Sequence, residues 1–180
     1  MQLFYKIMIH YQRWQPDQPV EAPLRLYRCI VESAWIDYNQ HMTEASYLTA
    51  FGDASDALFR YIGIDEAYRT AGHSYYTVET HINYYQECKS GAPLTFTTQI
   101  LDADAKRLHL FHSMFHSTTG DLLCTTEQML VHVDSQAAKA APALPHVQEA
   151  IEAILAVHQT LPIPKEVGRQ MKIVKRTVSG

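Results

Sequence analysis

The sequence predicts an α+β fold in which one long helix packs against an antiparallel sheet of about five strands. The run that follows Met42 has the apolar periodicity of a helix, and four later segments are rich in β-branched and aromatic residues. Short breaks separate these four segments, which favours antiparallel neighbours because parallel ones need crossover connections of a dozen or more residues. A length of 180 residues with 47% hydrophobic content fits one compact domain.

The predicted central helix extends from Thr43 to Ile62. Its apolar and small residues share one face at helical spacing, namely Tyr47, Leu48, Phe51, Ala54, Ser55, Leu58, Phe59 and Ile62. Thr43 or Ser46 can cap its start, and Gly63 suits the left-handed position just past its end. A helix of this length needs a broad partner surface, which the strands supply.

The strands are expected to follow one another as a meander. A first strand lies within residues 23–33, with a bulge near Arg28, and the other four span residues 73–85, 93–104, 106–118 and 122–134. An Ala- and Pro-rich linker then leads to a shorter helix from Val147 to His158, and a basic, loosely held tail from Arg169 to Arg176 follows. We therefore divide the chain into an N-terminal extension (1–22), the main domain (23–135), and a linker, helix and tail (136–180).

Composition argues against several classes of protein. The formal net charge is -4 without a long run of like charges, so nucleic-acid binding is not expected and an anionic ligand would need a local basic patch. The sequence has no apolar run long enough for a transmembrane helix, and Met1 to His10 lacks the ordered regions of a signal peptide. Three scattered cysteines suit reduced thiols, so we expect a cytoplasmic protein.

A polar triplet directly before the central helix is the candidate catalytic site. Asp37, Asn39 and His41 can together activate a water, donate hydrogen bonds to an oxyanion and pass a proton to a leaving group, which are the needs of acyl-transfer hydrolysis. The alternative is that Asp37 and Asn39 form a turn and a helix cap, with His41 bonded locally. Spacing alone favours the turn and cap.

Several motifs in order along the chain resemble the hot-dog-fold thioesterases of the 4-hydroxybenzoyl-CoA thioesterase-like group. They are Asp37-Tyr-Asn-Gln-His41 with Tyr47-Leu48, Tyr75-Tyr-Thr-Val-Glu-Thr-His81, Asp104-Ala-Lys-Arg-Leu-His109 and Glu127-Gln-Met-Leu-Val-His-Val-Asp134. From Val31 to Met171 the chain is most similar to the thioesterases of carnitine and betaine breakdown. The resemblance implies a helix wrapped by an antiparallel sheet, a homodimer or dimer of dimers, and active sites between subunits.

The same resemblance implies an acyl-CoA thioesterase for a small polar substrate, betainyl-CoA or a related trimethylammonium acyl-CoA, with no metal or bound cofactor. It makes Asp37 the group that orients or activates water, and Asn39 and His41 the groups that stabilise the thioester. Many relatives have a further Asp where this chain has Trp35, which weighs against a nucleophilic carboxylate at that position. The rival function is a non-catalytic acyl-CoA-binding or sensing module.

Further candidates lie on the second strand and beside the triplet. Glu79, expected on one face with Tyr75, Thr77 and His81, is either a general base or a structural hydrogen-bonding group. Four aromatic side chains form either a cage for a quaternary ammonium group by cation–π attraction or ordinary core and interface contacts; they are Trp35, Tyr38, Tyr75 and Tyr76.

Two basic residues at a hairpin turn, Lys106 and Arg107, are candidates for binding the phosphates of coenzyme A, a solvated turn being the alternative. Strand histidines invite a metal interpretation, but they lack a ligand motif and a common face; they are His109, His112, His116 and His132. We therefore predict no metal site.

Overall fold

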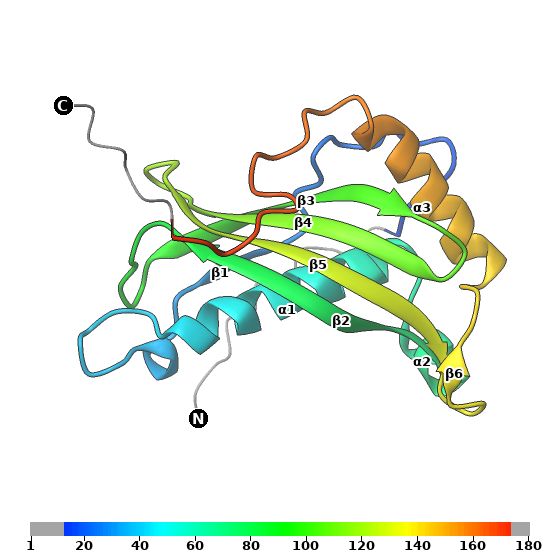
Figure 1. The fold of residues 1–180 in the computed structure, drawn as a ribbon, viewed down its shortest axis with the longest axis horizontal. Helices are drawn as coiled ribbons and strands as arrows, with labels where there is room; N and C mark the ends of the chain where they lie inside the picture. The colour runs from blue at the N-terminus through cyan, green and yellow to red at the C-terminus, as the bar shows by residue number, and fades with distance from the viewer. Residues whose placement is uncertain (1–12, 174–180) are drawn as a thin grey trace.

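The computed structural model describes residues 13–173, and it has the predicted α+β architecture (Figure 1). The strands are β1 (Arg28–Ile30), β2 (His73–Tyr84), β3 (Pro93–Ala103), β4 (Arg107–His116), β5 (Leu122–Asp134) and β6 (Lys139–Ala140). The helices are α1 (Glu44–Tyr61), α2 (Glu66–Thr70) and α3 (Pro145–His158), with a 3-10 turn at Ser33–Trp35. Residues 1–12 of the predicted extension and 174–180 of the predicted basic tail lie outside the described residues.

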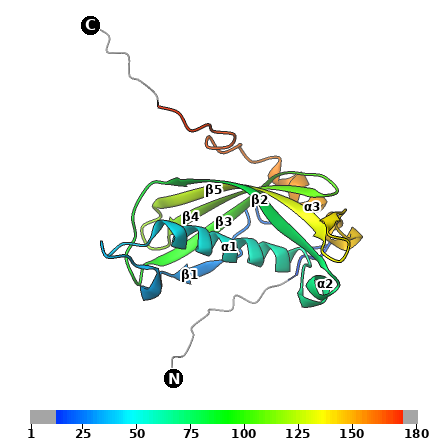
Figure 2. The same cartoon turned by 60° about the horizontal axis from the view of Figure 1, so that its bottom comes forward.

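Helix α1 begins and ends where the sequence indicates. The Thr43 side chain accepts a hydrogen bond from the Ser46 amide at the N-cap, and Gly63 follows the helix with a φ of 98°. The sheet curls around this helix, as Figure 2 shows. We call the face toward α1 the inner face, since it carries the buried Phe96, Met114 and Cys124 against Phe51. The opposite face is the outer face.

The strand order is β1-β3-β4-β5-β2, and every pairing is antiparallel. Hairpins join β3 to β4 and β4 to β5, as predicted, but the meander is wrong for β2, which pairs with β5 rather than β3. The connecting residues 85–92 are long enough for this. Eight extended residues reach about 27 Å, whereas three strand spacings from β2 to β3 amount to about 14 Å. Strand β2 is consequently an edge strand.

Three short features differ from the sequence-based expectation. Helix α2, capped by Asp65, and strand β6 were not predicted because elements this short show no measurable period. The first strand is shorter than residues 23–33: β1 has three residues, and Leu24 forms a separate bridge with Thr98. These differences leave the fold class unchanged.

A buried polar network joins α1 to the middle of the sheet. The His112 ring lies 2.9 Å from the Thr98 hydroxyl through Nδ1 and 3.1 Å from the Ser55 hydroxyl through Nε2. Ser55 also donates to Gln128 Oε1 at 3.2 Å. His112 is fully buried, and this burial lowers its pKa to about 4. The imidazole of His112 is therefore uncharged in the folded protein near neutral pH.

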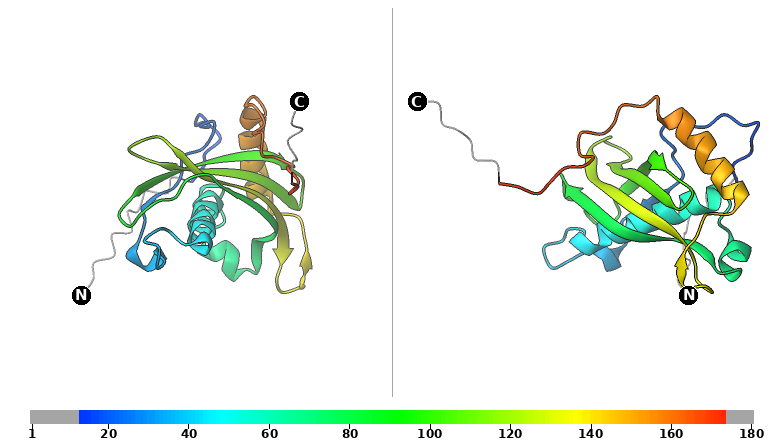
Figure 3. Two further views of the ribbon diagram at one scale, coloured as in Figure 1. Left: turned by 60° about the vertical axis from the view of Figure 1, so that its left-hand side comes forward. Right: turned by 45° about the vertical axis from the view of Figure 1, so that its right-hand side comes forward.

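Helix α3 packs against β3, and the residues after it lie on the outer face of the sheet. The Ile100 amide donates to His158 Nδ1 at 2.9 Å, which attaches the end of α3 to β3. The chain then crosses the outer face, on the side of the sheet away from α1 (Figure 3). There the buried Glu166 accepts a hydrogen bond from the Tyr85 hydroxyl, which attaches this segment to the end of β2. Within residues 13–173, no helix has the length and apolar character needed to cross a membrane.

Candidate active site

The residues between the 3-10 turn and α1 form a tight closed loop. The Asp37 amide donates to the His41 carbonyl at 2.9 Å, and the Gln40 amide returns to the Asp37 carbonyl at 3.1 Å. Gln40 has a φ of 66°, and Ile36 and Met42 pair as an isolated bridge at the base of the loop. The loop thus presents the predicted triplet immediately before the first turn of α1.

The Asp37 carboxylate is half-buried and organises this loop. Its Oδ1 accepts from the Asn39 amide at 2.8 Å and from the His41 amide at 3.4 Å, while Oδ2 lies 3.4 Å from the Asn39 side-chain nitrogen. These hydrogen bonds are the ones expected if Asp37 and Asn39 form a turn, which was the alternative to a catalytic role. They leave acceptor capacity on Oδ2, because a carboxylate oxygen has two lone pairs and this contact is long.

The imidazole of His41 faces a carboxylate from the connection between β2 and β3. Its Nε2 lies 3.4 Å from Glu87 Oε2, and the Met42 amide donates to the Cys88 carbonyl at 2.9 Å. This contact orients the ring of His41 toward the connection between β2 and β3. Glu87 was missed because no local pattern relates it to the triplet; only the path of residues 85–92 brings the two together.

Glu79 lies on β2, where a bulge changes the face that it occupies. The register shifts between Thr77 and Glu79, which makes Val78 the extra residue. Thr77 pairs with a core residue of β5, whereas Glu79 pairs with Met129 on the outer face. The expectation that Glu79 shares a face with Tyr75 is wrong, because one extra residue reverses the alternation. Glu79 is exposed, and no hydrogen bond or ion pair within residues 13–173 joins it to the Asp37 loop.

The four predicted cage aromatics do not converge within one chain. Tyr75 is a core residue that stacks on Phe59, with ring centroids 6.1 Å apart, and burial raises its pKa. Tyr76 points to the opposite face of β2 and is exposed. Trp35 packs partly against the core below the loop, whereas Tyr38 is 90% exposed at its tip. The structure therefore places Trp35 and Tyr38 beside the triplet, and Tyr75 and Tyr76 elsewhere.

The candidate residues for phosphate binding lie in the β3–β4 hairpin, where one of them is already paired. The Arg107 guanidinium lies 2.6 Å from Asp104 Oδ2, and its Nε donates to the same oxygen at 2.7 Å. This contact lowers the pKa of Asp104 to about 2. Lys106 is exposed, and its backbone amide also donates to Asp104. Arg107 stabilises its own turn, a local i, i+3 pairing that the sequence could have indicated.

The strand histidines occupy separate structural positions. His109 contacts Glu127 on the outer face at 2.8 Å, and His132 contacts the Tyr68 hydroxyl at 2.7 Å in the core. His116 accepts amide hydrogen bonds in the β4–β5 turn, and His112 is the buried residue already described. In the part of the chain that the structure describes, no three His, Cys, Asp or Glu side chains are grouped for metal binding.

A long helix enclosed by a curled antiparallel sheet is the hot-dog fold, which solved structures of thioesterases share, and in this chain an Asp-x-Asn-x-His loop precedes the helix. Residues 31–151 match the Thioesterase-like superfamily, and the chain belongs to that family.

Two curated relatives differ in how much of their own length this chain matches. It is 47% identical over 158 residues to an L-carnitine dehydrogenase/betainyl-CoA thioesterase of Rhizobium meliloti (strain 1021), covering 87% of this chain and 32% of that protein. The chain thus spans about a third of the first relatives' length. It is 42% identical over 147 residues to a betainyl-CoA thioesterase of Pseudomonas aeruginosa, covering 81% of this chain and 92% of that one.

One similar solved structure contains bound CoA. A Staphylococcus aureus protein in complex with CoA superimposes with a TM-score of 0.75 at 25% identity, covering 87% of this chain and 100% of that chain.

Proposed function

We propose that this chain hydrolyses acyl-CoA thioesters and that its substrate is a small polar acyl-CoA with a trimethylammonium group, such as betainyl-CoA. The observation that carries the proposal is the Asp37 carboxylate, fixed by amides of its own loop directly before α1 and within the segment that matches the superfamily. The relatives at 47% and 42% identity, both named for betainyl-CoA thioesterase activity, support the choice of acyl group.

The proposed reaction uses water as co-substrate. Asp37 accepts a proton from water through Oδ2 as the water oxygen attacks the thioester carbon, so that a C–O bond forms and an oxyanion develops. The side-chain amide of Asn39 and the first backbone amides of α1 stabilise that oxyanion, since the N-terminus of a helix has unpaired N–H donors and a partial positive charge. The C–S bond then breaks, His41 donates a proton to the departing thiolate, and the products are the free acid and coenzyme A.

Trp35 and Tyr38 flank Asp37 in the loop and are the proposed aromatic contacts for the trimethylammonium group. The 90% exposure of Tyr38 leaves its ring face available to a cation arriving from solvent. A contact of this kind contributes about 0.5 to 2 kcal/mol for each ring, depending on how far the cation is desolvated.

We propose that the protein is a homodimer, alone or as a dimer of dimers, joined through the free edge of β2. This edge strand has twelve residues, and its exposed side chains include Tyr76, Val78 and Glu79. A long edge with exposed apolar side chains is stabilised by pairing with another strand. Such an interface gives Glu79 and Tyr76 a place at a subunit boundary, where Glu79 can serve as an additional general base.

The test of the activity is release of coenzyme A, measured with a thiol reagent, from betainyl-CoA, benzoyl-CoA and a long-chain fatty acyl-CoA. We expect hydrolysis of betainyl-CoA in preference to the other two. Asp37→Asn keeps the acceptor for the loop amides but removes the base, so kcat should fall by at least about 100-fold. Asp17→Asn, an exposed site of the same chemistry, is the matched control and should retain full activity.

Three results would contradict the proposal. They are binding of betainyl-CoA without turnover, preference for an aromatic or long-chain acyl group, and unchanged kcat in Asp37→Asn and His41→Ala. The first would instead support an acyl-CoA-binding module, and the second would remove the ammonium substrate while retaining a thioesterase.

A further inference from the structure

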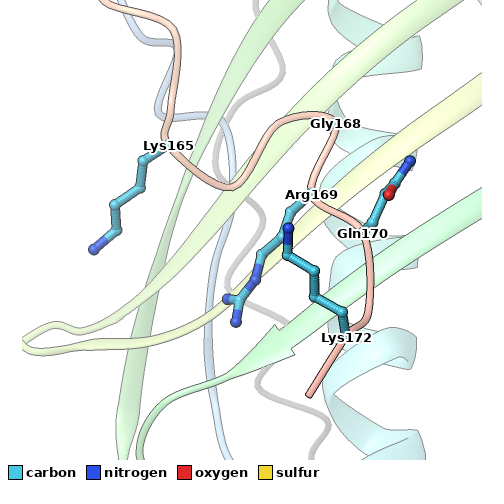
Figure 4. Close-up of a pocket in the computed structure, with 5 residues that line it drawn as sticks. All are labelled: Lys165, Gly168, Arg169, Gln170 and Lys172. Atoms are coloured by element: carbon cyan, nitrogen blue, oxygen red, sulfur yellow. The ribbon is translucent and has the colours of Figure 1, made fainter. Parts of the chain in front are cut away.

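The part of the chain after α3 forms a basic pocket on the outer face of the sheet. Residues 165–172 border a pocket of about 350 Å³ lined by Lys165, Gly168, Arg169, Gln170 and Lys172 (Figure 4). Three of these five residues are cations, in a chain whose formal net charge is -4. In Figure 4 the Arg169 and Lys172 side chains extend toward the same side of the segment. The pocket is the local basic patch that an anionic ligand of an acidic protein requires.

The carboxylates nearest this pocket are directed into the protein. Glu166 is buried and accepts from the Tyr85 hydroxyl at 2.9 Å, although its Oε1 is also 3.8 Å from Lys165 Nζ. Glu127 accepts from the Gly168 amide at 2.9 Å. The Lys165 side chain is 89% exposed, so its charge faces solvent. These contacts fix the backbone of the segment on the sheet and leave the cations outside, unlike the paired Arg107.

A single short stretch connects this pocket to the proposed active site. Asn83 accepts from the Arg169 guanidinium at 3.4 Å, and four residues further along Glu87 contacts His41. Four extended residues span about 13 Å, less than the length of the pantetheine arm between the thioester and the phosphates of coenzyme A. A thioester at the Asp37 loop can therefore have its nucleotide phosphates near Arg169.

We propose that Lys165, Arg169 and Lys172 bind the phosphate groups of the coenzyme A part of the substrate. This inference rests on the proposed function, and it places phosphate recognition after α3 rather than in the β3–β4 hairpin. Lysine and arginine donors bind phosphate through charge-assisted hydrogen bonds, and Arg169 is already oriented by Asn83. The pyrophosphate and the 3′-phosphate share this chemistry, and the two are separated by the choice of ligand in the test.

The test is isothermal titration calorimetry with free coenzyme A, dephospho-coenzyme A and pantetheine. In the triple variant Lys165→Ala/Arg169→Ala/Lys172→Ala, the Kd for coenzyme A should rise by about tenfold at low salt. Lys139→Ala, an exposed lysine on β6, is the matched control and should bind as the unaltered protein does. Lys106→Ala tests the hairpin as the alternative location.

The three ligands show which phosphate group, if any, the three cations bind. An effect of the triple variant on coenzyme A alone identifies the 3′-phosphate as the bound group, and an equal effect on dephospho-coenzyme A identifies the pyrophosphate. A pantetheine affinity that the triple variant leaves unchanged supports phosphate recognition. An unchanged Kd for coenzyme A in the triple variant, a loss in Lys106→Ala alone, or no binding of coenzyme A by the unaltered protein would overturn the inference.

Turnover separates this inference from the proposed function. If the unaltered protein hydrolyses betainyl-CoA while the triple variant binds coenzyme A normally, only the phosphate site is wrong. If the triple variant binds coenzyme A more weakly but the unaltered protein hydrolyses no thioester, only the hydrolase is wrong.

Discussion

Replacing His112 by glutamine is expected to reduce the dependence of stability on pH. His112 is fully buried between α1 and the sheet, and its contacts to Thr98 and Ser55 are with uncharged groups. Burial lowers its pKa to about 4 in the folded protein, compared with the ordinary histidine value of 6.5. The unfolded chain therefore binds this proton more readily than the folded protein does.

The sign of the effect follows from that difference in pKa. The stability contribution of neutral His112 is complete above pH 6.5 and is lost as the pH falls from 6.5 toward 4. The total loss is about 3 kcal/mol, of which about 2 kcal/mol falls between pH 7 and pH 5. Burial also lowers the pKa of His132 and His158, which therefore contribute in the same direction.

Urea unfolding at pH 7 and pH 5 measures the effect at one fixed protein concentration, since association changes apparent stability. His112→Gln should be less stable than the unaltered protein at pH 7, but it should lose about 2 kcal/mol less between the two pH values. His146→Gln, an exposed histidine, is the control and should keep the full pH dependence. Equal losses in His112→Gln and the unaltered protein would refute the assignment of the pH dependence to His112.

Two further expectations concern α1 and β2. Leu58→Ala should lower the free energy of unfolding by about 2 to 5 kcal/mol because it leaves a core cavity, whereas Leu48→Ala, 42% exposed on the same helix, should cost less than about 1 kcal/mol. Equal costs in urea unfolding would contradict this placement of the two side chains. Val78→Lys adds a charge at the edge of β2 and should shift the protein from dimer to monomer in sedimentation equilibrium. An unchanged dimer would exclude this edge as the interface.

Local sequence patterns predicted most elements of secondary structure correctly. The stripe from Tyr47 to Ile62, the Thr43 cap and Gly63 define α1 because helix periodicity and capping depend on residues within a few positions of one another. The four long strands were found for the same reason. For the Asp37 loop the sequence left two roles open, a turn and a catalytic site. The structure shows the turn, and Asp37 Oδ2 can still accept another hydrogen bond.

Local sequence patterns could not predict contacts between residues that lie far apart in the sequence. The pairing of β2 with β5, and the contact of Glu87 with His41, depend on the path of residues 85–92, which has no periodic signal. The bulge at Val78 transferred Glu79 to the outer face, since one unpaired residue reverses the alternation of a strand. The prediction that Glu79 shares a face with Tyr75 was therefore wrong, because the alternation rule holds only for regular strands.

The sequence by itself determined the helix, the long strands and the fold class, because each of these depends on short-range periodicity; the catalytic role of Asp37, Asn39 and His41 stays a prediction. Only the tertiary structure decided which strand forms the free edge and which aromatics lie beside Asp37. It also showed that residues 165–172 carry three cations onto the outer face. The physical reason is that these arrangements come from side-chain burial and hydrogen bonds between distant segments, such as Glu166 with Tyr85 and Glu127 with Gly168.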